Sequence, residues 1–184
     1  MEKRKKPVTA AYLERAALFY LERYSSSRKN LERVLDRKVR RRHEDHSPPS
    51  QEEKEWIKQA ADKCVNLGFV NDQRYASQKA LSMHLSGKSE RAIKNYLYHK
   101  GLSEEDISYA FKDLEEERGE DADLRAAIIY ARKRGFGPFR MRHKSEDREQ
   151  KDLASMLRAG HSMEQVHKVL KVSSVEELED ILYG

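Results

Sequence analysis

At Gly68-Phe69-Val70-Asn71-Asp72-Gln73-Arg74-Tyr75-Ala76 the chain turns from one predicted helix into the next. Gly68 ends the first helix, because glycine enters the left-handed backbone region without steric strain. Phe69 and the valine after it are expected to tuck back against the helices, and Asn71 or Asp72 caps the next helix, with Asp72 the expected cap. Arg74 is expected to pair with an acid across the corner, and Tyr75 to enter the core. The corner residues therefore carry mainly structural roles.

Apolar residues recur at helical spacing on both sides of this corner, so we predict an all-α fold. Before the corner, the pattern predicts helices at 9–24, around 31–35, and at 50–68, where Ser50 and Glu53 form a capping box. Three further helices are predicted after Asp72, three more after residue 124, and a short one at the C-terminus.

Two of the predicted corners match each other position by position. After Gly101, a serine follows at the second position and apolar residues at the sixth and tenth; the same holds after Gly160. Glycine permits the turn, serine caps the new helix, and the apolar residues dock it. The match indicates a repeat protein with three helices per repeat and a period of roughly 50 to 60 residues.

The predicted organisation has five parts. They are a basic arm at 1–8, a first repeat at 9–71 with a loop at 39–50, a second repeat at 72–115, an acidic connector at 116–123, and a third repeat with the C-terminal helix at 124–184.

The composition favours a helical protein with much exposed surface. Charged and apolar residues each make up 38%, a polar balance that fits an elongated helical protein better than a compact enzyme. The net charge of +5 makes a polyanion a sensible partner, although a mildly basic surface without such a partner explains it equally well. The chain has no apolar run long enough for a membrane-spanning helix and its start lacks a secretion signal, so we predict a cytoplasmic protein.

The chain resembles the RecX family, the bacterial regulators of the RecA recombinase. Residues 68–76 match the family's pattern of Gly, an aromatic residue or Leu, an aliphatic residue, Asp or Asn, Asp, any residue, Arg, Phe or Tyr, and Ala. Gly87-Lys88-Ser89 and the Lys100-Gly101 corner are similar to the family's middle repeat, and 17–35 is similar to the first. The resemblance covers residues 9–171. The loop at 39–50 is longer and more basic than the family's usual corner, and 132–140 resembles an alphaproteobacterial-like branch.

This resemblance implies an elongated, curved array of three three-helix repeats that binds in the groove of a RecA–DNA filament. There it would inhibit the recombinase, ATPase and coprotease activities of RecA in DNA repair and the SOS response, as a regulator and not an enzyme. The implied partners are the RecA filament and, weakly and without sequence specificity, single- or double-stranded DNA; we expect a monomer. Two other functions stay open, a helix-turn-helix DNA-binding module and a helical adaptor that binds only protein.

Basic residues are the predicted contacts with DNA or with the filament, because lysine and arginine neutralise phosphates. The candidates are Lys88, Lys100, Arg132, Lys133, Arg134, Arg140, Arg142 and Lys144, with Arg40, Arg41 and Arg42 as weaker ones in a flexible segment. Phe136 and Phe139 lie among them and either stack on bases or pack under the turn.

No catalytic or metal-binding pattern is predicted. His43 and His46 are three residues apart in a predicted loop and lack a third ligand, so we expect no metal site. Cys64 is the only cysteine and lies on an apolar helix face, where it is expected to act as a small core residue. The chain has no Walker-type phosphate loop, and we expect no cofactor.

Overall fold

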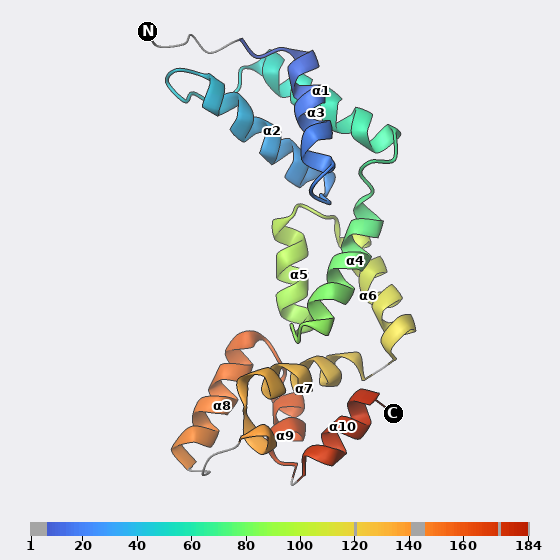
Figure 1. Cartoon of the computed structure of the whole chain (residues 1–184), viewed down its shortest axis with the longest axis vertical. Coiled ribbons are helices and arrows are strands. Elements are labelled where there is room, and N and C mark those ends of the chain that lie inside the picture. The colour runs from blue at the N-terminus through green and yellow to red at the C-terminus, as the bar shows by residue number, and fades with distance from the viewer. Residues whose placement is uncertain (1–6, 120, 141–145, 173, 184) are drawn as a thin grey trace. The chain divides into compact units, whose positions relative to one another are not determined.

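A computed structural model of the chain describes residues 7–119, 121–140, 146–172 and 174–183, which form only helices and their connections (Figure 1). The predicted all-α fold is therefore confirmed. In chain order, the helices are α1 (Ala10–Leu21), α2 (Arg28–Arg42), α3 (Gln51–Asn66), α4 (Asp72–Leu85), α5 (Glu90–His99), α6 (Glu104–Arg118), α7 (Ala122–Arg134), the short 3-10 helix η1 (Gly137–Phe139), α8 (Glu146–Ala159), α9 (Met163–Leu170) and α10 (Val175–Tyr183).

The chain divides into two compact units. The first unit holds Met1–Tyr75 and His99–Asp106, and the second holds Ala76–Tyr98 and Ile107–Gly184. The division runs through α4, α5 and α6, the three helices of the predicted second repeat. The repeat bounds at 9–71, 72–115 and 124–184 and the elongated, curved arrangement stay predictions.

The core of the first unit lies between α1, α2 and α3. Each of these helices begins at a hydroxyl side chain that accepts a hydrogen bond from a backbone N–H of the first turn, and the predicted capping box at Ser50 and Glu53 is present. Their apolar faces are buried together at Leu13, Ala17, Leu31, Leu35, Ile57 and Ala61.

The loop predicted at 39–50 is shorter than expected, because α2 continues to Arg42. Val39 is fully buried in the core, and the Arg42 guanidinium lies 3.6 Å from the centre of the Tyr12 ring. These contacts hold the last turn of the helix. The prediction that Arg40, Arg41 and Arg42 form a flexible segment is therefore wrong.

The acidic connector predicted at 116–123 is also mostly helical. α6 continues to Arg118, and α7 begins at Ala122. Leu114 is buried one turn before the end of α6, and glutamate is a good helix former, so the glutamates after Leu114 extend the helix. Of the remaining short connection, Glu120 lies outside the described residues.

The corner at 68–76 has the predicted backbone but not all of the predicted side-chain positions. Gly68 has a φ of 76°, and the N–H groups of Gly68 and Phe69 donate to the carbonyls of Val65 and Cys64, which completes a Schellman motif. Val70 tucks in and is 2% exposed, whereas Phe69 is 55% exposed. Consecutive side chains of a non-helical segment point to opposite sides, so only one of the pair reaches the core. The prediction that Phe69 packs inward is wrong.

Asn71, not Asp72, caps α4. The Asn71 Oδ1 atom accepts a hydrogen bond of 2.8 Å from the backbone N–H of Arg74. Asp72 instead accepts the backbone N–H of Arg28 at 2.8 Å, and so caps the start of α2. Tyr75 is buried, as predicted. The Arg74 side chain is exposed and forms no ion pair with any described residue, which contradicts its predicted acidic partner.

Asp72 is one half of a junction between consecutive helical segments. The other half is Ser27, whose hydroxyl accepts the backbone N–H of Asn30 and donates to the carbonyl of Lys100 at 2.6 Å. Thus the N-terminus of α2 is tied to the start of α4 through Asp72 and to the end of α5 through Ser27.

The same junction occurs again in the second unit. The Ser89 hydroxyl at the start of α5 accepts the N–H of Ala92 and donates to the carbonyl of Ala159 at 2.8 Å. Asp123, in the first turn of α7, accepts the N–H of Glu90 at 3.1 Å. Serine and aspartate therefore perform the same two tasks at α5 that they perform at α2, which is direct structural evidence for an internal repeat.

Both junctions require a glycine at the point of closest approach. Gly101 and Gly160 follow the two carbonyls that accept the serine hydroxyls, and both have positive φ. A Cβ atom on Gly101 would lie 2.5 Å from the Cβ of Lys29, and one on Gly160 would meet the hydroxyl of Ser89. The glycines thus allow the turn and also the contact between neighbouring repeats.

His161 occupies the position after Gly160 that Leu102 occupies after Gly101. It is 3% exposed, and its ring lies 5.2 Å from the ring of Tyr130. Neither ring nitrogen has a partner at hydrogen-bonding geometry among the described residues. Burial lowers the pKa of His161, while Asp123 and the backbone of Gly87 oppose this effect.

We expect Gly101→Ala to destabilise the protein more than Gly68→Ala. Both glycines have positive φ, which costs an alanine about 1 kcal/mol. Only at Gly101 would the new methyl group also clash with another residue, Lys29, because nothing lies within 4 Å of the corresponding position at Gly68. Urea denaturation of both variants measures the loss in the free energy of unfolding. Equal losses would show that Lys29 moves aside at no energetic cost.

We expect Ser27→Ala to lower the free energy of unfolding by about 1 kcal/mol more than Thr9→Ala. Both changes remove a helix N-cap, but only Ser27 also donates a hydrogen bond across the junction. Urea denaturation checks this expectation, which equal effects of the two substitutions would contradict.

The stability of the protein should depend on pH through His161. Its folded-state pKa lies below that of the unfolded chain, so below about pH 6.5 the unfolded state binds more protons. The contribution of the neutral ring is therefore complete above that pH and is lost as the pH falls. The test is the variant His161→Leu, which places at 161 the residue type that stands at the equivalent position 102. Between about pH 7.5 and about pH 5.5, we expect the Tm of this variant to fall less than that of the wild type.

Comparison with the wild type is necessary because other histidines also contribute to the pH dependence of stability. Burial and the nearby Arg118 lower the pKa of His84, which acts in the same direction as His161. The hydrogen bond with Glu53 raises the pKa of His43, which acts in the opposite direction. An unchanged difference in Tm between the two pH values in the His161→Leu variant would contradict the role of His161.

Candidate functional site

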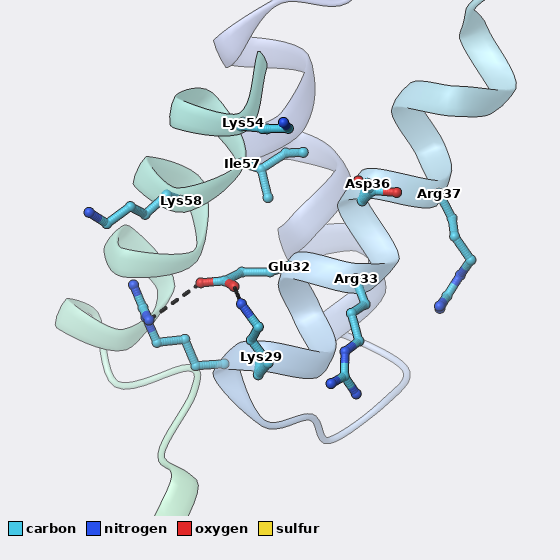
Figure 2. A pocket seen from close by; sticks show the side chains of 9 residues that line it. Lys29, Glu32, Arg33, Asp36, Arg37, Lys54, Ile57 and Lys58 are labelled. Atoms are coloured by element: carbon cyan, nitrogen blue, oxygen red, sulfur yellow. Dashed lines mark hydrogen bonds and ion pairs between the residues drawn. The ribbon is translucent and has the colours of Figure 1, made fainter. Parts of the chain in front are cut away.

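The main candidate site is an open groove in the first unit, between α2 and α3, with a volume of about 700 Å³ (Figure 2). Figure 2 shows Ile57 and Glu32 between the two helices, with basic side chains along each helix. The residues that line the groove are Arg28, Lys29, Glu32, Arg33, Asp36, Arg37, Lys54, Ile57 and Lys58.

Helical spacing places these basic residues in two rows. Lys29, Arg33 and Arg37 are four residues apart on α2, and Lys54 and Lys58 are four residues apart on α3. Residues four apart lie on the same face of a helix, about 6 Å apart along its axis. Each helix therefore presents its positive charges at regular steps along the groove.

Both carboxylates of the groove are already neutralised by neighbouring cations. Glu32 pairs with Arg28 at 3.4 Å and with Lys29 at 2.8 Å, and Asp36 pairs with Arg40 at 2.6 Å. Six cations and two carboxylates line the groove, which leaves a surplus of four positive charges.

The cations of the groove differ in how firmly the protein holds them. Arg28 also binds Asp62 at 2.5 Å, and Arg33 donates to the carbonyl of His99. Arg37, Lys54 and Lys58 are exposed and have no hydrogen-bond or ion-pair partner in the part of the chain that the structure describes. These three side chains, which we call the free cations, are available to an external anion.

The sequence-predicted contacts in the second unit have other partners or are simply exposed. Arg132 donates to the hydroxyl of Tyr183 at 2.8 Å, and Lys133 donates to the carbonyl of Ser86 at 3.0 Å. The guanidinium of Arg134 lies 5.6 Å from the centre of the Tyr130 ring. Lys88 is exposed beside the α4–α5 turn.

Arg140 has a structural role. Its guanidinium lies 2.6 Å from both carboxylate oxygens of Asp152, and the two side chains are 17% and 5% exposed. Asp152 also accepts the backbone N–H of Gly137, so the pair holds the turn after α7. Because this turn packs on the core of the second unit through Phe136 and Phe139, packing is favoured over base stacking for the two aromatic residues. Arg142 and Lys144 lie outside the described residues.

The remaining predicted contacts lie in the first unit. Lys100 approaches Asn30 through its ammonium group at 3.4 Å, and its carbonyl belongs to the junction with Ser27. Arg40 is paired with Asp36, Arg42 lies on Tyr12, and Arg41 is exposed on the last turn of α2.

The free cations were not among the predicted contacts. They are separated in the sequence. Lys54 and Lys58 stand near acidic residues, and Arg37 lies between Asp36 and Lys38, just before the run Arg40-Arg41-Arg42. The signal that could have identified them is the four-residue spacing of basic residues on two helices that pack against each other.

Cys64 and His43 are held in structural positions. The thiol is 3% exposed, and burial raises its pKa, which disfavours the reactive thiolate. His43 is engaged by Glu53 at 2.9 Å and by Ser47. Among the described residues, no three His, Cys, Asp or Glu side chains are grouped so that they could hold a metal ion, and no helix is long and apolar enough to cross a membrane.

Comparisons with known proteins show which sequences and folds this chain resembles. Residues 71–110 match the family model described as RecX, second three-helix domain. Two solved structures share the fold. The crystal structure of RecX from Lactobacillus salivarius has a TM-score of 0.62 at 23% identity, and the match covers 92% of this chain and 96% of that chain. A second crystal structure, of a regulatory protein RecX, has a TM-score of 0.59 at 20% identity, and the match covers 88% of this chain and 71% of that chain.

Relatives with higher sequence identity extend over nearly the whole chain. The regulatory protein RecX of Myxococcus xanthus is 38% identical over 169 residues, which cover 91% of this chain and 89% of that protein. The regulatory protein RecX of Agrobacterium fabrum is 32% identical over 176 residues, which cover 94% and 88%. At this identity and coverage, the chain belongs to the RecX family of regulatory proteins.

Proposed function

We propose that this protein regulates RecA by binding the filament that RecA forms on DNA. Bound there, it restrains ATP turnover, strand exchange and coprotease activity, and so acts as a negative regulator in DNA repair and the SOS response. It works by binding and not by catalysis, as a cytoplasmic monomer. Membership of the RecX family supports the role of a RecA regulator.

The observation that carries this proposal is the positive groove between α2 and α3. A nucleoprotein filament contains a polyanion, and a groove with a surplus of four positive charges is attracted to it. Attraction between exposed charges is weakened by salt, because the Debye length falls from about 30 Å at 0.01 M to about 10 Å at 0.1 M ionic strength. A regulator that binds in this way should lose potency as the salt concentration rises.

The rate of ATP hydrolysis by RecA on single-stranded DNA tests the proposal. We expect inhibition that increases with the amount of this protein, begins below a one-to-one ratio to RecA, and weakens at higher salt. A suitable control is this protein after heat denaturation, at the same concentration and the same two salt concentrations.

An unchanged ATPase rate in molar excess of this protein would refute the proposal. Sequence-selective binding to duplex DNA would then favour a helix-turn-helix DNA-binding module. An absence of retention on DNA at low salt would instead favour a helical adaptor whose only partner is protein.

A further inference from the structure

We infer that the groove between α2 and α3 binds the sugar–phosphate backbone of single-stranded DNA, and that Arg37, Lys54 and Lys58 are its phosphate contacts. This inference rests on the proposed function, since it names which component of the filament the groove meets. It assigns the site to two helices of the first unit, where none of the three contact residues was predicted from basic runs in the sequence.

The distribution of charge is the first reason. The two carboxylates that line the groove already have cationic partners, so they do not compete for Arg37, Lys54 and Lys58. The free cations come from two different helices and are exposed. Lysine carries its charge on a flexible stem, which allows it to follow phosphates whose positions are not fixed.

The chemistry of the groove favours a phosphate backbone over a protein surface. Protein interfaces have an apolar core enriched in aromatic residues and depleted of charge. The groove is lined by eight charged side chains and one apolar side chain, Ile57, which is only 6% exposed. It therefore lacks the apolar anchor on which a protein partner would depend.

The same lining indicates which part of the strand the groove contacts. Proteins that hold bases usually stack them on aromatic side chains, and no aromatic residue lines this groove. The contacts are therefore with phosphates, and binding should be independent of base sequence and strongly dependent on salt.

The groove suits a short, flexible length of backbone. Its volume of about 700 Å³ falls within the range of ordinary small-molecule sites, roughly 300 to 1,000 Å³. A duplex is stiff, with a persistence length of about 50 nm, so its phosphates keep nearly fixed positions. A single strand is far more flexible, and it can adjust its phosphates to cations on both helices.

Fluorescence anisotropy with a labelled oligothymidylate, without RecA, tests the inference directly. Binding by the full chain is measured between about 50 and about 200 mM salt for the wild type and for the triple variant Arg37→Gln, Lys54→Gln, Lys58→Gln. Each lost contact with a single strand reduces the log–log salt slope by about 0.7, so the triple variant should lose about 2.

The matched control is the triple variant Arg15→Gln, Arg148→Gln, Arg158→Gln. These arginines are exposed, lie outside the groove, and have no ion-pair partner among the described residues, so the control removes the same charge. It should keep the wild-type slope. Circular dichroism of both variants verifies that the helices are intact. The same anisotropy measurement is made with a labelled duplex of the same length as a second ligand.

Each outcome decides the inference. A loss of slope in the groove variant alone, on the single strand, supports it, even where the wild type fails to inhibit RecA and the proposed function is refuted. Equal slopes for the groove variant and the wild type overturn it. If the slopes are equal but the groove variant no longer inhibits RecA, the groove meets an acidic protein surface, and the proposed function stands. Three other results overturn the inference. An equal loss of slope in the groove and control variants indicates an effect of net charge only. A loss of slope seen only with the duplex excludes the single strand as the ligand, and an absence of wild-type binding at low salt excludes DNA.

Discussion

The structure depends on one arrangement, a serine hydroxyl that serves two backbones at once. At the start of α2, the hydroxyl of Ser27 accepts a backbone N–H of its own helix and donates to a carbonyl at the end of α5. Helix ends leave backbone groups without partners, and such groups are costly to bury. The serine satisfies one group at each of two ends, and Asp72 satisfies a third. Ser89 and Asp123 repeat the arrangement in the second unit, so both units contain the same solution to the same problem.

This arrangement also leaves the exposed faces of the helices available for function. The junction uses the first residues of α2, whereas the positive groove uses residues farther along the same helix together with α3. The core between α1, α2 and α3 fixes the faces from which Arg37, Lys54 and Lys58 project. The proposed contact residues are thus charged and exposed, and the residues that position them are apolar and buried.

The sequence predicted the backbone of the fold well and its polar contacts poorly. Helical periodicity, the turn glycines and the capping boxes depend on neighbouring residues, so they can be recognised locally. The role of Asp72 depends on Arg28, which lies far away in the sequence, and local reasoning assigned it to the nearer helix. Arg140 was predicted to be a phosphate contact for the same reason, because its partner Asp152 was not apparent. The groove was missed because its cations come from two helices and are interspersed with acids.

The second repeat takes part in both junctions, in a different role each time. Through Lys100 it accepts the hydroxyl of Ser27, and through Ser89 it donates to Ala159. Its middle helix, α5, therefore carries a complete donor end and a complete acceptor end. Two copies of this segment placed in tandem would form the same bonds with each other that they form with their present neighbours. The hydrogen bonds of the junction use backbone carbonyls, so duplication of the central segment would reproduce them. The side chains at the junctions differ, since Lys29 lies against Gly101 and Arg91 against Gly160.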